Sequence, residues 1–256
     1  MKLHPTAIIH KGTKLAEDVE VGPYSIIDES VTIGQGTVIG PHCVIEGRTT
    51  IGENCRIFTG AVVGSIPQDL KYRGEKSFLK VGNNNIIREY VTINPGTGEG
   101  GETSIGDGNL LMAYAHVAHD CKIGNGVIIA NVGTLAGHVT IGDKAIVGGL
   151  AAIHQFVRVG IISIIGGCSK VVQDVPPYST VDGHPTRVYG LNSIGLKRAG
   201  IPKESISSLK RAFRILFHSG LSLNTALERI DREAEKCPEL SFLIDFMKTS
   251  ERGVSR

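Results

Sequence analysis

Four histidines and one aspartate in the middle of the sequence are residue types that general acid–base chemistry uses: His116, His119, Asp120, His138 and His154. His119 directly precedes Asp120, and a carboxylate beside an imidazole can hold it in one tautomer and make it a better base. Such a pair suits the removal of a proton from a hydroxyl nucleophile. Gly137 has no side chain, so its backbone N–H is available to a developing oxyanion. If the fold brings these residues together, they predict a site for proton abstraction.

The sequence around these residues repeats every six positions. From Val117 to Val159 every sixth residue is a branched aliphatic, and the spacing continues to Ile105 on one side and Val171 on the other. An earlier series runs from Leu3 to Val63. Neither the helical period of about 3.6 residues nor simple alternation keeps one residue type at every sixth position for so long. We therefore predict a repeat array.

The repeat unit is a short strand followed by a turn. Glycine often follows the aliphatic residue, as at Gly34 and Gly124, and the residue two places before it is usually small or β-branched, as at Val31 and Cys121. Inward positions two residues apart describe a strand, and the glycine supplies the turn. Three units form a triangular coil of eighteen residues, and successive coils stack about 4.8 Å apart. The expected fold is mainly β, a parallel β-helix.

Residues that differ by eighteen positions lie one above the other in such a coil. His138 then stacks over Asp120, and Gly137 stacks over His119. The other two histidines named above project from the same edge, within about 10 Å along the axis. A purely structural β-helix predicts no such clustering of titratable residues, so the edge is interpreted as a functional site.

The six-residue pattern fails twice, near residues 64–80 and 94–104. Asp69 and Glu75 stand where aliphatic residues are due, and the second stretch is rich in glycine. Insertions in repeat arrays project as loops, often from the binding face. Both segments are therefore candidate substrate loops.

After Val171 the segment 171–185 is expected to leave the coil, and helical periodicity begins near Ile194. The division predicted from this change is a β-helix over residues 1–190 and a helical domain over residues 191–256. One helix is expected between Pro202 and Gly220, a second over residues 222–237, and a third from Pro238. These helices are placed to cover the open end of the β-helix, which would otherwise expose unpaired strand edges.

Composition narrows the class of protein. The formal net charge is +2 and basic residues are not interleaved with aromatic ones, so we expect no nucleic-acid binding. No apolar run could span a bilayer, and the first twelve residues do not resemble a signal peptide. The five cysteines lack paired spacing, and Cys43, Cys55 and Cys121 fall on inward positions. They are interpreted as core thiols of a cytoplasmic protein, and Cys121 as a core residue and not a nucleophile.

Several phrases of the sequence are more specific than the repeat. They are Gln68–Tyr72, Ala115–Cys121, Leu135–His138, Ile153–Phe156, Gln173–Pro177 and Gly195–Arg198. On these phrases the chain resembles the UDP-N-acetylglucosamine O-acyltransferases, a family of hexapeptide-repeat enzymes, nearly from end to end. The resemblance implies a left-handed coil. It also implies transfer of an (R)-3-hydroxyacyl chain from acyl carrier protein to the sugar 3-hydroxyl, the first step of lipid A synthesis.

The resemblance also implies roles for individual residues. His119 is the expected general base, Asp120 orients it, and the Gly137 N–H stabilises the oxyanion. Residues expected to bind the substrates are Gln68, Asp69, Lys71, His116, His138, His154, Gln155, Gly167, Asn192 and Arg198. Among these, Gly167 is expected to measure the acyl chain, and His154, Gln155, Asn192 and Arg198 are expected to lie near the nucleotide. The implied assembly is a homotrimer with sites between subunits, with no metal and no cofactor beyond the phosphopantetheine of acyl carrier protein.

The sequence departs from the family pattern at three positions. Asn94 replaces a histidine, Ile194 replaces a glutamate found in some members, and Lys170 stands where a small residue is expected. None of these changes falls on the His119–Asp120 pair.

Other functions remain open from the sequence. Within the same chemistry, the acceptor can be the 3-amino analogue of the sugar nucleotide, or the donor acetyl-CoA. The N-acyltransferase of the same pathway shares the repeat, but it typically has an additional N-terminal domain. A different class is a zinc enzyme of the γ-carbonic anhydrase type, with His116, His119 and His138 as ligands.

Overall fold

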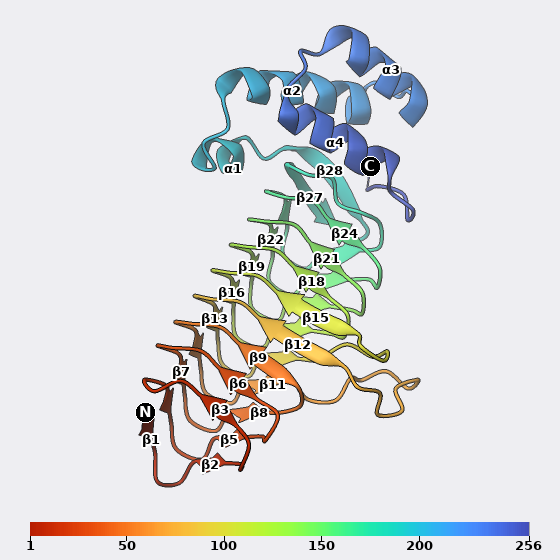
Figure 1. The fold of residues 1–256 in the computed structure, drawn as a ribbon. Coiled ribbons are helices and arrows are strands. Elements are labelled where there is room, and N and C mark those ends of the chain that lie inside the picture. The colour runs from red at the N-terminus through yellow and green to blue at the C-terminus, as the bar shows by residue number, and fades with distance from the viewer. Residues whose placement is uncertain (256) are drawn as a thin grey trace.

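The computed structural model describes residues 1–255 and shows a triangular coil of short parallel strands with helices at one end (Figure 1). The first sheet contains β1 (Lys2–Leu3), β4 (Glu20–Val21), β7 (Val38–Ile39), β10 (Arg56–Ile57), β13 (Ile86–Ile87), β16 (Leu110–Leu111), β19 (Ile128–Ile129), β22 (Ile146–Val147), β25 (Ile164–Ile165), β27 (Ser179–Gly183) and β28 (Thr186–Leu191). The second contains β2 (Ile8–Ile9), β5 (Ile26–Ile27), β8 (Val44–Ile45), β11 (Val62–Val63), β14 (Thr92–Ile93), β17 (His116–Val117), β20 (Thr134–Leu135), β23 (Ala152–Ile153) and β26 (Lys170–Val171). The third contains β3 (Lys14–Leu15), β6 (Thr32–Ile33), β9 (Thr49–Ile51), β12 (Phe78–Val81), β15 (Glu102–Ile105), β18 (Lys122–Ile123), β21 (Thr140–Ile141) and β24 (Arg158–Val159).

The register of the strands follows the predicted coil. His116 lies opposite Thr134, and Thr134 opposite Ala152, so that each step along a sheet advances the chain by eighteen residues. The predicted fold, a left-handed parallel β-helix of six-residue repeats with helices at its C-terminal end, is confirmed.

The core is a column of the repeated aliphatic residues. Val117, Ile129 and Leu135 are completely buried, as are the predicted core thiols Cys43, Cys55 and Cys121. The column is open at its first coil, where Leu3 is 41% exposed.

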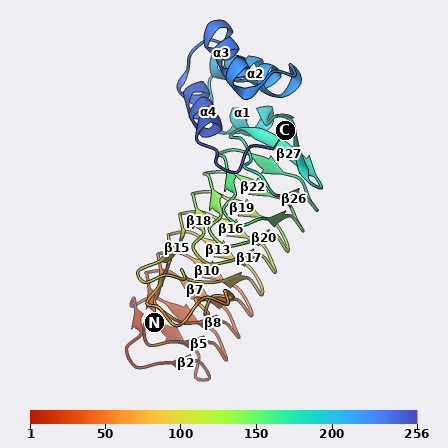
Figure 2. The ribbon, with the colours of Figure 1, turned by 90° about the vertical axis from the view of Figure 1, so that its right-hand side faces the viewer.

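Both insertions leave the coil at one corner, where the second sheet turns into the third (Figures 1 and 2). We call this edge, with its turns at residues 118–121, 136–139 and 154–157, the histidine corner. The chain rejoins the third sheet at Phe78 and Glu102, so the last residues of each predicted loop are strand residues. The loops themselves cover residues 64–77 and 94–101.

The expectation that residues 171–185 leave the coil is wrong for most of this segment. Val175 pairs with Val159, and β27 pairs with β25 as a further parallel strand of the first sheet. This coil advances the chain by sixteen residues, as from Val159 to Val175, and the shortened spacing concealed the repeat. The antiparallel strand β28 then ends the sheet.

Four helices follow: α1 (Ser193–Arg198), α2 (Lys203–His218), α3 (Leu223–Glu233) and α4 (Pro238–Lys248). The three predicted helices correspond to the last three. Ser222 caps α3, whose end at Glu233 comes earlier than predicted because Ala234 is extended. α2 packs against β28, α3 and α4, and the helices cover the last coil (Figure 1). The division into two domains at residues 190 and 191 stays a prediction.

The end of the described chain returns to the coil. Val254 pairs with Asp174, and the Ser255 N–H donates to the Asp174 carbonyl at 2.9 Å. Among residues 1–255, no helix combines the length and apolar character needed to cross a bilayer.

Candidate functional site

The turns of the histidine corner share a backbone conformation that stacks their side chains. Asp120, His138 and Phe156 each have a left-handed backbone, with φ of 58°, 61° and 66°. The N–H of His138 donates to the carbonyl of His119 in the coil below at 3.0 Å, and the Phe156 N–H donates likewise to Gly137. This ladder of turns places residues eighteen apart in direct contact, as the repeat arithmetic predicts.

His119 and Asp120 form a hydrogen-bonded pair. The Nδ1 atom of His119 lies 2.8 Å from Oδ2 of Asp120, and the side chains are 14% and 15% exposed. The carboxylate can only accept here, so Nδ1 carries the proton and Nε2 is the basic nitrogen. Oδ2 of Asp69, from the first loop, lies 4.0 Å from that Nε2 atom.

The second loop holds Asp120 from its other side through Thr97, which the sequence analysis did not identify. The Thr97 hydroxyl donates to Oδ2 at 2.7 Å, and the Thr97 N–H lies 3.2 and 3.3 Å from the two carboxylate oxygens. Burial acts to raise the pKa of Asp120, but the hydrogen bonds from His119 and Thr97 together outweigh it, so the pKa is lowered. Thr97 belongs to an insertion, so the repeat pattern gave no signal for it.

His138 lies between the pair and an aromatic ring. Its imidazole meets that of His119 edge to face, with 5.1 Å between centroids, and its Nε2 lies 3.8 Å from Asp120 Oδ2. On its other side the ring stacks on Phe156 at 4.6 Å with 10° between the planes. Phe156 was also missed, although it lies eighteen residues after His138.

Gly137 lies against the imidazole of His119. A Cβ atom on this glycine would be 2.4 Å from Cε1 and 2.5 Å from Nε2 of that ring. Within residues 1–255, the Gly137 N–H donates to no backbone or side-chain acceptor. The turn therefore offers a free donor beside the basic nitrogen.

His116 lies on the outer face of β17, the strand that leads directly into the turn of His119 and Asp120. Its Nδ1 is 2.6 Å from the hydroxyl of Thr92 on β14. Burial lowers the pKa of His116 most, and electrostatic repulsion from the nearby His119 lowers it further. The neutral imidazole is therefore the favoured form of this residue.

Gln68, Asp69 and Lys71 all belong to the first loop. Asp69 accepts from the Lys71 N–H at 2.8 Å, while the side chains of Gln68 and Lys71 are exposed. The buried Asn94 holds the start of this loop, because its amide donates to the carbonyls of Ser65 at 3.0 Å and Ile66 at 3.2 Å.

His154 and Gln155 occupy the next coil of the histidine corner and are exposed. A guanidinium nitrogen of Arg252 lies 3.2 Å from His154 Nδ1. The returning C-terminal segment therefore contributes a cation to this corner.

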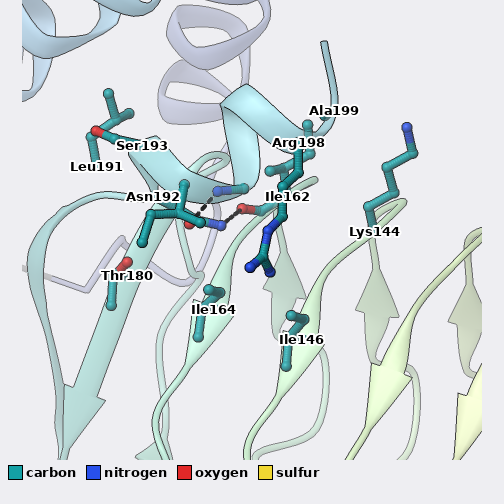
Figure 3. Close-up of a pocket in the computed structure, with 12 residues that line it drawn as sticks. Lys144, Ile146, Ile162, Ile164, Thr180, Leu191, Asn192, Ser193, Arg198 and Ala199 are labelled. Atoms are coloured by element: carbon teal, nitrogen blue, oxygen red, sulfur yellow. Dashed lines mark hydrogen bonds between the residues drawn. The ribbon is translucent and has the colours of Figure 1, made fainter. Parts of the chain in front are cut away.

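Asn192 and Arg198 lie at a different corner, where the third sheet turns into the first. We call it the Lys144 corner, with turns at residues 142–145 and 160–163. Here α1 roofs a cavity of about 740 Å³ over Ile146 and Ile164, and Arg198 reaches down toward these two residues (Figure 3).

Within this cavity Asn192 has a structural role. Its amide donates to the Ile162 carbonyl at 2.8 Å, and its oxygen caps α1 by accepting from the Gly195 N–H. Arg198 and Lys144, by contrast, are exposed and form no ion pair within the described chain. Lys144, which the sequence analysis missed, adds a second unpaired cation to the cavity lining.

Gly167 lies at the third corner, in the turn between β25 and β26, and is exposed. A Cβ atom there would approach only the carbonyl oxygen of Gly149, at 3.3 Å. One chain therefore distributes the predicted site residues over all three corners: the histidine corner gathers most of them, Asn192 and Arg198 share the cavity at the Lys144 corner, and Gly167 lies apart at the third.

A metal set exists at the histidine corner, but it differs from the histidine triad considered above. The ligand atoms of His119, Asp120 and His138 lie within 4.8 Å of one another, and His116 is not among them. Two ligands of a tetrahedral zinc ion lie about 3.3 Å apart. The 2.8 Å between His119 Nδ1 and Asp120 Oδ2 fits a hydrogen bond better than shared ligation.

Two parts of the chain match known family models, one in the six-residue coil and one at the C-terminal end. Residues 30–65 and 102–132 match the family described as bacterial transferase hexapeptide (six repeats). Residues 174–255 match the second domain of UDP N-acetylglucosamine O-acyltransferase.

Comparison over the full length is more specific. The chain is 61% identical to the acyl-[acyl-carrier-protein]–UDP-N-acetylglucosamine O-acyltransferase of Aquifex aeolicus, over 100% of this chain and 98% of that protein. It is 62% identical to the enzyme of the same name from Chlorobaculum tepidum, over 95% and 93%. The structure of a UDP-N-acetylglucosamine acyltransferase from Bacteroides fragilis superposes with a TM-score of 0.96 at 43% identity, covering 99% of each chain. The chain belongs to the acyl-[acyl-carrier-protein]–UDP-N-acetylglucosamine O-acyltransferase family, as the sequence phrases predicted.

Proposed function

We propose that this protein transfers an (R)-3-hydroxyacyl chain from acyl carrier protein to the 3-hydroxyl of UDP-N-acetylglucosamine, the first step of lipid A synthesis in the cytoplasm. Family membership supports the reaction. The observation that carries the mechanism is the His119–Asp120 hydrogen bond, which leaves the basic Nε2 open beside the Gly137 N–H.

In this mechanism Nε2 of His119 takes the proton of the sugar 3-hydroxyl. The resulting oxygen nucleophile attacks the thioester carbonyl carbon, and the Gly137 N–H donates to the oxyanion of the tetrahedral intermediate. The C–S bond then breaks, and the thiolate of the phosphopantetheine takes the proton from His119. Asp120 keeps its negative charge throughout and stabilises the imidazolium.

Asp69 and His138 are placed to bind the acceptor. Asp69 Oδ2 lies 4.0 Å from Nε2, so that a sugar hydroxyl placed to one side of both atoms can hydrogen-bond to each, and His138 lies against the same imidazole. Gln68, Lys71, His116, His154 and Gln155 surround this space in the proposal. No further cofactor takes part.

We further propose a homotrimer in which neighbouring chains complete each site. The support is the separation of the corners, because His119 of one chain cannot share a pocket with Arg198 and Lys144 of the same chain when they occupy different edges of the coil. In a symmetric ring, the histidine corner of one subunit can face the Lys144 corner of the next. The two cations then lie where a nucleotide diphosphate needs them.

The reaction is tested with 3-hydroxyacyl carrier proteins and UDP-N-acetylglucosamine, with the 3-amino analogue as a second acceptor. We expect transfer to the hydroxyl sugar, and a loss of about 100- to 10,000-fold in His119→Ala. Transfer to the amine alone would keep the mechanism and change the acceptor. Full activity without the imidazole would contradict the mechanism, and an activity that a chelator removes and zinc restores would favour the metal alternative.

Sharing of sites is tested by co-expression. His119→Ala and Arg198→Ala are each expected to be nearly inactive, whereas mixed assemblies contain sites with both native residues and regain activity. If the mixture is no more active than the two separate variants, the sites are not shared.

A further inference from the structure

Thr97 makes the closest contact to Asp120 from outside the coil. Its hydroxyl donates to Oδ2 at 2.7 Å, the same oxygen that accepts from His119 Nδ1 at 2.8 Å. The Thr97 N–H adds a longer contact to each carboxylate oxygen. Oδ2 therefore receives two short hydrogen bonds, one from the base and one from the loop, and together they fix the rotation of the carboxylate.

The loop that carries Thr97 is fastened to the first loop. Glu99 accepts from the Lys76 N–H at 2.9 Å, and the Gly100 N–H donates to the Lys76 carbonyl at 2.7 Å. The first loop in turn carries Asp69, which faces the opposite nitrogen of His119. Contacts therefore connect Asp120 to the second loop through Thr97, the second loop to the first, and the first loop to Nε2 of His119 through Asp69.

We propose that Thr97 is a positioning residue for the His119–Asp120 pair: its hydroxyl holds the carboxylate so that His119 keeps its proton on Nδ1 and presents Nε2 to the acceptor. The inference rests on the proposed function. Thr97 acts on the pair without touching the reacting atoms, and it sets the distance between the base and the sugar-facing Asp69.

The pKa of Asp120 agrees with this role. Burial acts to raise this pKa. The hydrogen bond from His119 lowers it most, and the hydrogen bonds from the Thr97 side chain and backbone lower it next. Without the hydroxyl the carboxylate would be less well stabilised and freer to rotate.

The experiment compares Thr97→Val, Thr97→Ser and Thr103→Val with the native protein. Valine has the shape of threonine without the hydroxyl, and serine restores the hydroxyl. Thr103 is the matched control, because it is fully buried in β15, directly after the same loop, and its hydroxyl has no partner within the described chain. Steady-state transfer gives kcat and KM. Proton NMR of the protein without substrate detects the far-downfield ring N–H of an imidazole bonded to a carboxylate, and His119→Ala assigns that signal.

In Thr97→Val we expect kcat to fall about 10- to 100-fold with KM for the acyl donor little changed, and the downfield signal to shift or broaden. Thr97→Ser should recover most of both properties, and Thr103→Val should change neither. Native kcat and an unmoved signal in Thr97→Val would overturn the proposal. So would an equal loss of kcat in Thr103→Val, which would show that any isosteric change near the loop has this effect.

The two proposals fail in different ways. If the native protein transfers no acyl chain, the proposed function is wrong, yet the NMR comparison still decides whether Thr97 positions the pair. If the native protein transfers the acyl chain but Thr97→Val changes neither kcat nor the downfield signal, only the inference about Thr97 is wrong.

Discussion

A Cβ atom on Gly137 would lie 2.5 Å from Nε2 of His119, closer than real Cβ contacts allow. Gly137→Ala should therefore push the imidazole away from the free N–H of residue 137. We expect kcat to fall about 10- to 100-fold, because small displacements of reacting groups are costly. Gly98→Ala is the control, since a Cβ there would meet nothing within 4 Å. Equal kcat values for the two variants would show that the imidazole does not need this position.

Asp120→Asn keeps the shape of the side chain and removes its charge. The amide can offer its NH₂ group to His119 Nδ1, which would move the ring proton to Nε2 and block the base. We expect kcat to fall about 100- to 10,000-fold. Asp143→Asn is a matched control, because Asp143 holds the Asn125 N–H through Oδ1 in a turn of the Lys144 corner and asparagine preserves that oxygen. A similar kcat in both variants would contradict the orienting role of Asp120.

His116 should make stability depend on pH. Burial lowers its pKa below the ordinary value of 6.5, so the folded protein resists protonation of this residue more than the unfolded chain does. Its contribution is present above pH 6.5 and is lost as the pH falls through the lowered pKa. The melting temperature should drop between pH 7.5 and pH 5, and His116→Gln should reduce that drop. His10→Gln, which alters an exposed histidine, should not.

The cysteines should differ sharply in reactivity. Burial raises the pKa of the Cys121 thiol to about 12 and also raises those of Cys43 and Cys55, whereas Cys168 is exposed. An alkylating reagent at pH 8 should modify Cys168 and leave these three thiols until the protein unfolds, as peptide mass spectrometry can show. Cys121→Ala should retain kcat. A large fall in kcat with an unchanged melting temperature would contradict the core role and indicate that Cys121 is a nucleophile.

Gly167→Met should shorten the preferred acyl chain if the groove runs past this turn. The site is exposed, and a Cβ there would meet only the Gly149 carbonyl oxygen, at a tight 3.3 Å that a shift of a few tenths of an ångström relieves. The ratio of kcat/KM for long and short donors supplies its own control, because general damage lowers both values together. An unchanged ratio would remove Gly167 from the groove.

The sequence predicted most of the coil because one inward position recurs every six residues and a shift of one residue would expose it. The same spacing predicted that His138 lies over Asp120. It could not predict the contact of Thr97 with Asp120, because a loop outside the repeat obeys no spacing rule. It also could not separate the corner of Arg198 from that of His119, because motif resemblance assigns residues to a site without placing them on particular edges of the coil.

The two ends of the coil differ in how they are closed. The last coil is covered by helices and clamped by the strand contact of Val254 with Asp174, whereas the first coil leaves Leu3 in solvent. In a stack where each layer contacts only its neighbours, the uncovered first coil should open before the covered last coil. Amide exchange should therefore begin near Met1 and advance layer by layer, so that terminal fraying can consume the first coils while the chemistry around His119 remains intact.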